Sequence, residues 1–265
     1  MTYAIGLDIG SLSTKILLLE RKNGSKPEIV DYVVRRSTYD FKRVAREILE
    51  ELLANNQLQR ADVSTIMGTG YGRHSVEFIS KRVTEISAHG RGVAYFFPDA
   101  KTVIDIGGQD SKVIKLNGGK VMDFQMNDKC AAGTGRFCEV MARALEVPLE
   151  RLGPLSLESK SPEQISSTCT VFAESEVISL FAKGADKRDI AAGIHVAIAK
   201  RVGGMAKRLG VVPRVVFCGG VAKNLGVKKA LERELGVEIS SPENPQITGA
   251  LGAALIALES SKSSN

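Results

Sequence analysis

The spacing of apolar residues predicts alternating strands and helices along the first half of the chain. Two apolar runs flank a short polar stretch of small residues, which is typical of a β-hairpin. Apolar side chains recur at helical spacing from Phe41 to Leu53, which predicts an amphipathic helix. The expected strands cover 3–9, 14–20, 28–35 and 65–70. The expected helices cover 40–56, a short segment after 70, and a segment that begins near Ile86.

The pattern restarts after Pro98 with a strand–turn–strand–turn–strand segment and then becomes mostly helical. The stretch from Gly210 to Pro213 should end a long helix, because glycine and proline interrupt helical structure. The expected helices cover 133–147, 172–184, 186–209, 225–235 and 247–260. A buried strand is expected at 214–220, a short strand at 237–240 and a frayed tail at 261–265.

The two hairpin segments resemble each other along their length. Each has Asp-Ile-Gly, a small polar turn, and a lysine that leads into an apolar strand. The lysine lies seven residues after the aspartate in both, from Asp8 to Lys15 and from Asp105 to Lys112. We infer an internal duplication of one supersecondary unit; a chance likeness of two hairpins is the alternative. No long linker is visible, so the two halves should abut and enclose a cleft.

Each Asp-Ile-Gly turn has the groups that a phosphate-binding loop needs. Glycine permits the tight bend, backbone N–H groups of such a turn can hold phosphate oxygens, and the carboxylate can hold Mg²⁺ through water. One such turn is common, but two in tandem followed by Phe-Cys-Gly-Gly favour nucleotide hydrolysis. A Walker P-loop is absent, and no GxGxxG follows a strand. The candidates in the turns are Asp8, Gly10, Ser11, Ser13, Thr14, Lys15, Asp105, Gly107 and Gly108.

Composition argues against several other function classes. The 265 residues, 43% of them hydrophobic, suffice for one large domain or two compact ones. No run of 18 apolar residues occurs and the N-terminus lacks the features of a signal peptide, so we expect a cytoplasmic protein without a membrane partner. The net charge is +6, but the 36 basic residues are scattered and tryptophan is absent, so no nucleic-acid partner is expected.

Two of the four cysteines stand in loops just before predicted helices. Cys130 lies in NDKCAAGTGRF, a glycine-rich loop that includes Gly133, and Cys169 lies in ISSTCTVF. A helix N-terminus favours a thiolate or a thiolate-bound cluster. Cubane clusters usually take four ligands, which a symmetric dimer could supply from these two loops. Spacing alone also permits two inert buried thiols, and Cys138 and Cys218 are expected to be small core residues.

The order of the motifs resembles the actin, sugar-kinase and heat-shock-chaperone ATPase superfold. GLDIGSLSTK is similar to its first phosphate loop, VIDIGGQDSK to its second, VVFCGGVAKN to its adenosine motif and TEISAHGRGVAYFF to its connecting helix. The resemblance implies an α/β fold of two ribonuclease H-like domains, a duplicated mixed sheet with helices, around a nucleotide cleft. It implies a first domain of 1–97 plus 246–265, and a second domain of 98–245 that carries the two loop cysteines.

The same resemblance implies roles for further residues. Glu85 matches an acidic position near the attacking water, although an acid at a helix start also complements the helix dipole. Lys15 could contact phosphate or could be a surface strand residue. The adenosine motif adds Gly219, Gly220, Lys223 and Asn224 as nucleotide-binding candidates.

Both cysteine segments also resemble those of the ATP-dependent activators of 2-hydroxyacyl-CoA dehydratases and the related ATPase subunits of benzoyl-CoA reductase, from GLDIG to TGALGAAL. The resemblance implies one four-iron four-sulfur cluster that bridges a homodimer through Cys130 and Cys169. ATP with magnesium would drive a low-potential electron into a partner iron–sulfur enzyme, and a ferredoxin or flavodoxin would be the donor. By position, Gln109 would lie near the γ-phosphate, and Asp8 and Asp105 would hold magnesium through water.

The chain departs from that family pattern in two places. Leu12 follows Ser11 where the first loop more usually reads DIGST, and RRSTYDFKRV replaces a Gly/Thr-rich stretch after the third strand. These departures leave the details of nucleotide and partner contact open and do not touch the cysteine segments. Functions of other classes stay open as well. A small-molecule kinase of the same superfold would not need the loop cysteines, and a chaperone-like or filament ATPase is a further alternative. Within the family, the partner could be a dehydratase, an aryl-CoA reductase or a double-cubane-cluster reductase.

Overall fold

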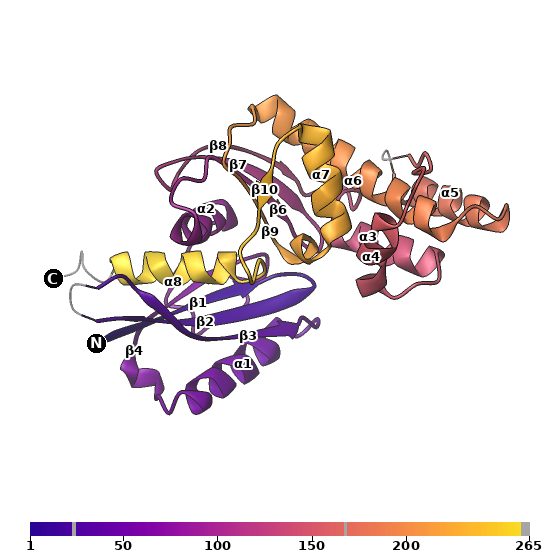
Figure 1. Ribbon diagram of the computed structural model, residues 1–265. Coiled ribbons are helices and arrows are strands. Elements are labelled where there is room, and N and C mark those ends of the chain that lie inside the picture. Colours follow the sequence, from indigo (N-terminus) through magenta and orange to yellow (C-terminus); the bar gives the residue numbers. More distant parts are fainter. Residues whose placement is uncertain (23–24, 167–168, 261–265) are drawn as a thin grey trace. The chain divides into compact units, whose positions relative to one another are not determined.

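The computed structural model describes residues 1–22, 25–166 and 169–260, which form two compact units (Figure 1). Unit 1 comprises Met1–Asp99, Asn117–Val121 and Gln246–Asn265, and unit 2 comprises Ala100–Leu116 and Met122–Pro245. Each unit is built on its own five-stranded sheet. The tail expected to fray, 261–265, lies outside the described residues. In the part of the chain that the structure describes, no helix is long and apolar enough to cross a membrane.

The sheet of unit 1 has the strand order β3-β2-β1-β4-β5. β1, β2 and β3 form an antiparallel meander, while β4 pairs parallel with β1 and β5 pairs parallel with β4. The strands cover β1 Thr2–Ile9, β2 Ser13–Arg21, β3 Glu28–Arg36, β4 Val63–Thr69 and β5 Lys81–Arg82. The helices cover α1 Phe41–Asn55, η1 Arg60–Asp62, α2 Glu85–Phe96 and α8 Thr248–Ser260.

Alternation along β1 distributes its side chains between two helical layers. Ile5, Leu7 and Ile9 are fully buried in a cluster with the apolar face of α1. Ala4, one position away, is buried in a second cluster with α8. A Cβ added at Gly6 would lie 2.6 Å from the Ala254 nitrogen of α8, so glycine is required where this helix crosses the strand.

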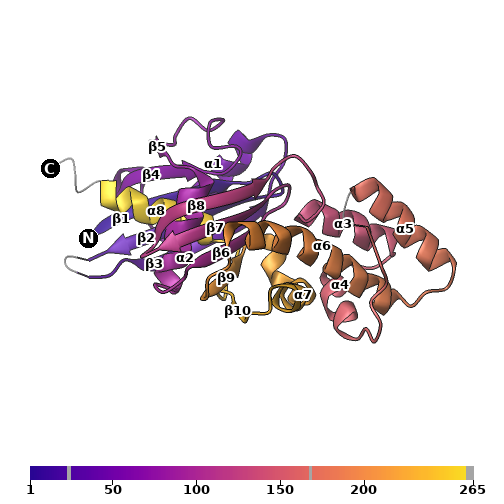
Figure 2. The same ribbon diagram turned by 90° about the horizontal axis from the view of Figure 1, so that it is seen from above.

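The sheet of unit 2 has the equivalent order β10-β9-β6-β7-β8. Its core joins the sheet to helices that gather around α6, and Figures 1 and 2 show α3, α4 and α5 grouped at one end of α6. The strands cover β6 Thr102–Ile106, β7 Ser111–Asn117, β8 Lys120–Asn127, β9 Val215–Cys218 and β10 Ile239–Ser240. The helices cover α3 Gly135–Ala144, α4 Leu149–Leu157, α5 Thr170–Ala182, α6 Lys187–Leu209, η2 Gly220–Lys223 and α7 Leu225–Leu235.

Strand register confirms the predicted duplication. Asp8 of β1 stands directly opposite Lys15 of β2, and Asp105 of β6 stands directly opposite Lys112 of β7. The seven-residue spacing is therefore that of a cross-strand pair on either side of a tight turn, and it places a carboxylate and an ammonium group side by side in both units.

Two expectations about the elements are wrong. No helix forms after β4, because Gly70 takes a φ of 87° and the chain to Ser80 then runs through turns. The helix expected over 133–147 ends at Ala144, where Glu146 takes a φ of 55°. A separate helix, α4, follows it, and Gly153 and Pro154 hid its pattern because both residues ordinarily interrupt helices.

Candidate active site

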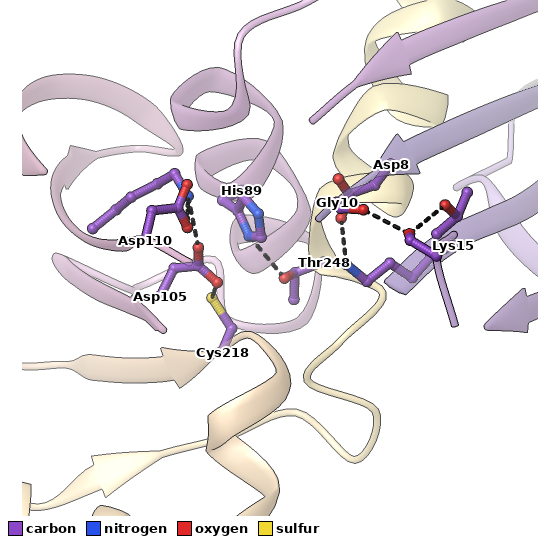
Figure 3. A network of polar contacts seen from close by, with 11 residues as sticks. Asp8, Gly10, Lys15, His89, Asp105, Asp110, Cys218 and Thr248 are labelled. Atoms are coloured by element: carbon purple, nitrogen blue, oxygen red, sulfur yellow. Dashed lines mark hydrogen bonds and ion pairs between the residues drawn. The ribbon is translucent and has the colours of Figure 1, made fainter. Parts of the chain in front are cut away.

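The first Asp-Gly hairpin of unit 1 is a closed turn that holds an internal ion pair (Figure 3). Asp8, at the end of β1, is 5% exposed, and the Lys15 ammonium donates to its Oδ2 across 3.1 Å. The backbone N–H of Gly10 donates to the Ser13 carbonyl oxygen at 3.1 Å and closes the turn. The Lys15 side chain is 14% exposed, so it lies within the hairpin rather than on the open strand surface.

Ser37, just after β3, braces this hairpin from outside. Its hydroxyl donates to the Gly10 carbonyl oxygen at 2.6 Å, and its backbone N–H donates to the Leu12 carbonyl oxygen at 3.0 Å. The Ser37 hydroxyl also lies 2.9 Å from the Thr14 hydroxyl, which must be the donor because Ser37 has one proton and gives it to Gly10. Ser37 belongs to the RRSTYD segment, so the departure from the family pattern supplies a support for the loop.

The Asp8 carboxylate is enclosed by close backbone approaches from two directions. A Cβ added at Gly70 would lie 2.6 Å from Asp8 Oδ1, and one added at Gly249 would lie 3.0 Å from Asp8 Oδ2 and 3.1 Å from His89 Nε2. The His89 ring is buried on α2, where its Nδ1 lies 3.0 Å from the Thr248 hydroxyl. The Asp8 carboxylate and the His89 imidazole therefore both lie close to Gly249, and Figure 3 shows His89 beside Thr248.

Glu85 begins α2, and Thr84 caps that helix by accepting from the Ser87 backbone N–H. The Glu85 carboxylate is 3.8 Å from the Arg73 guanidinium, which donates to the Gly70 carbonyl oxygen at 2.9 Å. Glu85 is thus connected through Arg73 to the turn that covers Asp8.

The second hairpin, in unit 2, repeats the ion pair in a more buried form (Figure 3). The Lys112 side chain is 2% exposed, and its ammonium lies 2.8 Å from Asp110 and 3.4 Å from Asp105. The Cys218 thiol donates to Asp105 Oδ1 at 3.7 Å. Gln109 is exposed at the tip of the turn.

The Gly-Gly turn after β9 lies against this hairpin. Gly219 has a φ of 85°, and a Cβ there would lie 2.6 Å from Asp105 Oδ1, so only glycine fits. Gly220 and Lys223 are exposed on η2, and Asn224 caps α7 by accepting from the Val227 backbone N–H at 3.2 Å. The adenosine-motif candidates therefore form one continuous turn beside Asp105.

Cys130 is half-buried in a loop tied by its own polar groups. The Asn127 amide donates to the Cys130 carbonyl oxygen at 2.8 Å and to the Ala132 carbonyl oxygen at 3.2 Å, and the Thr134 hydroxyl donates to the Ala131 carbonyl oxygen at 2.6 Å. Gly133, at a φ of 83°, packs under the Arg201 side chain.

Cys169 is the half-buried N-cap of α5, and its carbonyl oxygen accepts from the Ala173 backbone N–H at 3.0 Å. α5 packs on α3, the helix that follows the Cys130 loop. Cys138, by contrast, is buried in α3, and burial raises its pKa to about 12, so this thiol stays protonated.

The Cys130 loop is joined to the second hairpin through the start of α3. The Gly135 N–H donates to the Gly107 carbonyl oxygen and the Arg136 N–H to the Gly108 carbonyl oxygen, both at 2.8 Å. These are two of the N–H groups that a helix start leaves without intrahelical partners.

Comparisons with known proteins show the family of the chain. Residues 5–257 match the BadF/BadG/BcrA/BcrD ATPase family. The chain is 50% identical over 256 residues to the (R)-2-hydroxyglutaryl-CoA dehydratase activating ATPase of Acidaminococcus fermentans, covering 96% of each chain. It is 49% identical over 263 residues to the 2-hydroxyisocaproyl-CoA dehydratase activator of Clostridioides difficile, covering 99% of this chain and 97% of the relative.

The solved structure titled as the activator of the 2-hydroxyisocaproyl-CoA dehydratase from Clostridium difficile with bound ADPNP superposes with a TM-score of 0.92 and 48% identity. The match covers 99% of this chain and 97% of that chain. The chain belongs to the BadF/BadG/BcrA/BcrD ATPase family. The match also confirms the predicted two-domain α/β fold of the actin-like ATPases.

The family is named as an ATPase family, and the oxygen donors of each hairpin fit hydrated Mg²⁺. Besides the Asp8 and Asp105 carboxylates, the hydroxyls of Thr69 and Ser111 are buried without a hydrogen-bond partner among the described residues. Thr69 stands opposite Asp8 in the sheet, and Ser111 stands opposite Ile106, next to Asp105. Oxygen donors of this kind are the ones Mg²⁺ and its bound waters prefer.

Two of the thiols fit the ligands of an iron–sulfur cluster. Cys130 and Cys169 are free, half-buried thiols that precede packed helices, whereas Cys138 and Cys218 are buried. Thiolates are the usual ligands of iron–sulfur clusters. One chain supplies two such thiols.

Several residues of the site were not expected from the sequence. The duplication pointed to Lys112 as the counterpart of Lys15, but Asp110 stands where the first hairpin has Ser13, so the repeat did not indicate it. Cys218 was expected in the core, where it is, but its donation to Asp105 was not foreseen. No local pattern marks Thr69.

Proposed function

We propose that this ATPase uses ATP hydrolysis to drive a low-potential electron into a partner iron–sulfur enzyme such as a 2-hydroxyacyl-CoA dehydratase. The electron carrier would be one four-iron four-sulfur cluster, held by Cys130 and Cys169 of two identical subunits and reduced by a ferredoxin or flavodoxin. The names of the related activators support a dehydratase as the partner enzyme. The ADPNP bound to the related C. difficile activator supports the nucleotide site.

The observation that carries the proposal is the pair of hydrogen bonds from the start of α3 to the second hairpin. A nucleotide that changes the position of Gly107 or Gly108 changes the acceptors on which Gly135 and Arg136 depend. The displacement would pass through α3 to the Cys130 loop, because packed elements move as bodies. A single pair of backbone bonds thus connects the phosphate turn to a ligand loop.

The residues around the phosphates would have separate roles. Asp8 and Asp105 would hold Mg²⁺ through water, and Glu85 would orient the attacking water. Gln109, exposed at the tip of its turn, would reach the γ-phosphate. When bound, the cluster supplies one-electron chemistry at a potential set by charge, hydrogen bonds and solvent exposure.

Anaerobic purification followed by iron and acid-labile sulfide analysis tests the proposal. About four of each per dimer are expected in the wild-type protein. C130S and C169S should lose both, whereas C138A should keep both, because Cys138 lies buried in the interior of α3. Full iron content in C130S would overturn the assignment.

A kinase of the same superfold is the competing function. It predicts that a small-molecule substrate accelerates ADP formation by protein that contains no iron after anaerobic reconstitution. The same assay, run with and without a candidate dehydratase and a reduced donor, separates the two functions.

A further inference from the structure

His195 is buried in the middle of α6, where a polar ring has a cost unless it is hydrogen bonded. The residue is 1% exposed, and its neighbours on the helix are alanine, isoleucine and valine. Burial lowers its pKa to about 3, so the ring is neutral and has one donor and one acceptor nitrogen. An apolar side chain could fill this space equally well. The hydrogen bonds of the imidazole ring therefore explain why the residue is a histidine.

The hydrogen bonds around His195 have one consistent direction. The Ser156 hydroxyl donates to the Gly153 carbonyl oxygen at 2.7 Å, which uses its proton. Ser156 must then accept from His195 Nδ1, 2.8 Å away. His195 Nε2 is left as the acceptor for the Asn224 amide, 3.1 Å away. This assignment follows from the network because every proton has one place to go.

Asn224 is held at both ends of its side chain as a result. Its Nδ2 donates to His195, and its Oδ1 accepts from the Val227 N–H at the start of α7. Its backbone N–H donates to the Val221 carbonyl oxygen of η2 at 2.9 Å. Asn224 therefore ends the Gly219–Lys223 turn and begins α7, and His195 fixes its orientation.

Two glycines make room for this network. A Cβ added at Gly226 would lie 2.5 Å from His195 Nδ1, and one added at Gly153 would lie 2.7 Å from Asn224 Oδ1. The start of α7 therefore approaches the His195 ring, and the interior of α4 approaches the Asn224 side chain, more closely than any larger residue would permit.

We propose that His195 is a positioning residue for the nucleoside part of the bound nucleotide, acting through Asn224 on the Gly219–Lys223 turn. The inference rests on the nucleotide site of the proposed function and on the adenosine-binding role that the sequence resemblance implies for this turn. Because Gly219 lies against Asp105, the orientation of the turn decides where a nucleoside lies relative to the second phosphate hairpin.

A matched pair of variants isolates the bond to Asn224. In H195Q the side-chain amide reaches the position of Nε2 and keeps the acceptor for Asn224. In H195N the shorter amide reaches only the position of Nδ1 and keeps the bond to Ser156. We expect H195N to bind ADP about tenfold more weakly, the loss typical of one hydrogen bond, and H195Q to stay within about threefold of wild type.

Binding of inorganic pyrophosphate distinguishes a positioning role from a merely structural one. A general structural defect would weaken the binding of pyrophosphate as well as that of ADP. Since pyrophosphate occupies phosphate sites without a nucleoside, its dissociation constant should be the same in wild type, H195Q and H195N when measured by calorimetry with Mg²⁺. Equal weakening of ADP and pyrophosphate in H195N, or unchanged ADP binding, would overturn the inference. If H195N does not fold, S156A, which frees the ring to rotate, must show the same selective loss of ADP binding.

The controls separate this inference from the proposed function. Iron content per dimer should be equal in all variants, since the network contains neither loop cysteine. Wild-type protein that binds ADP but contains no iron contradicts the electron-transfer proposal and leaves the role of His195 standing.

Discussion

The backbone N–H of Gly135 donates to the carbonyl oxygen of Gly107 across 2.8 Å, which joins the helix after the Cys130 loop to the turn of the second Asp-Gly hairpin. A Cβ at position 135 would lie 3.1 Å from that same oxygen and 3.3 Å from the Gly108 Cα. The bond and the close approach together make this position sensitive to one added methyl group.

G135A should therefore loosen the connection while leaving the cluster ligands in place. We expect the iron content of the wild type, because the cysteine ligands are unchanged, together with loss of any nucleotide-dependent change in the cluster spectrum. Anaerobic visible and electron paramagnetic resonance spectra with ADP and with a non-hydrolysable ATP analogue measure the effect. G204A in α6 is the control, since its Cβ would meet nothing closer than 3.7 Å. A wild-type spectral response in G135A would contradict the coupling.

K112M should destabilise unit 2 strongly. The change leaves Asp105 and Asp110 without the buried ammonium that lies 3.4 and 2.8 Å from them. Loss of one partner of a buried ion pair typically costs about 3–5 kcal/mol. Denaturant titration monitored by circular dichroism gives the free energy of unfolding. K42M, which removes an exposed pair with Glu77, should cost less than about 1 kcal/mol. Equal effects of the two substitutions would be inconsistent with a buried pair.

S37A should weaken nucleotide binding through the first hairpin. The Gly10 carbonyl oxygen loses its donor and the Thr14 hydroxyl loses its acceptor. An unsatisfied buried polar group costs about 1–3 kcal/mol, so we expect ADP binding to weaken by about fivefold or more. S25A is the control, because Ser25 lies exposed and donates only to the Lys22 carbonyl oxygen. An unchanged ADP affinity in S37A would show that the hydrogen bonds of the Ser37 hydroxyl are not needed for nucleotide binding.

Stability should fall in acid because of His195. Its pKa is about 3 in the folded protein against a usual value of 6.5, so the unfolded chain binds the extra proton first as the pH falls. The contribution is therefore complete above pH 6.5 and is lost progressively between about pH 6.5 and 3, at about 1.4 kcal/mol per pH unit. H195Q should show a shallower loss between pH 6.5 and 4.5 in denaturant titrations. Parallel curves for the two proteins would exclude a buried neutral histidine.

The sequence indicated the parts of the fold that depend on local pattern. The Asp8–Lys15 spacing predicted the duplication because a cross-strand pair and its turn lie within a few residues of each other. The same repeat contained Lys112, but nothing local shows that its ammonium is buried between two carboxylates. α4 was missed because its stability comes from packing on α6 and α7 rather than from its own residues.

Contacts between distant segments account for most of what could not be predicted. Ser37 reaches Gly10 across 27 positions, and His195 reaches Asn224 across 29 and Ser156 across 39. A serine in a polar loop and a histidine in an apolar helix are ordinary by themselves. Their partners become known only when the strands and helices are assembled.

Each Asp-Gly hairpin carries its own counter-ion. Lys15 offsets the charge of Asp8, and Lys112 offsets one of the two charges of Asp105 and Asp110, so a free divalent cation gains less by binding there than it would at unpaired carboxylates. A phosphate group at either hairpin would change this balance, because it could draw the ammonium group to itself and release the carboxylate toward a metal. We therefore expect magnesium to arrive with the nucleotide rather than ahead of it.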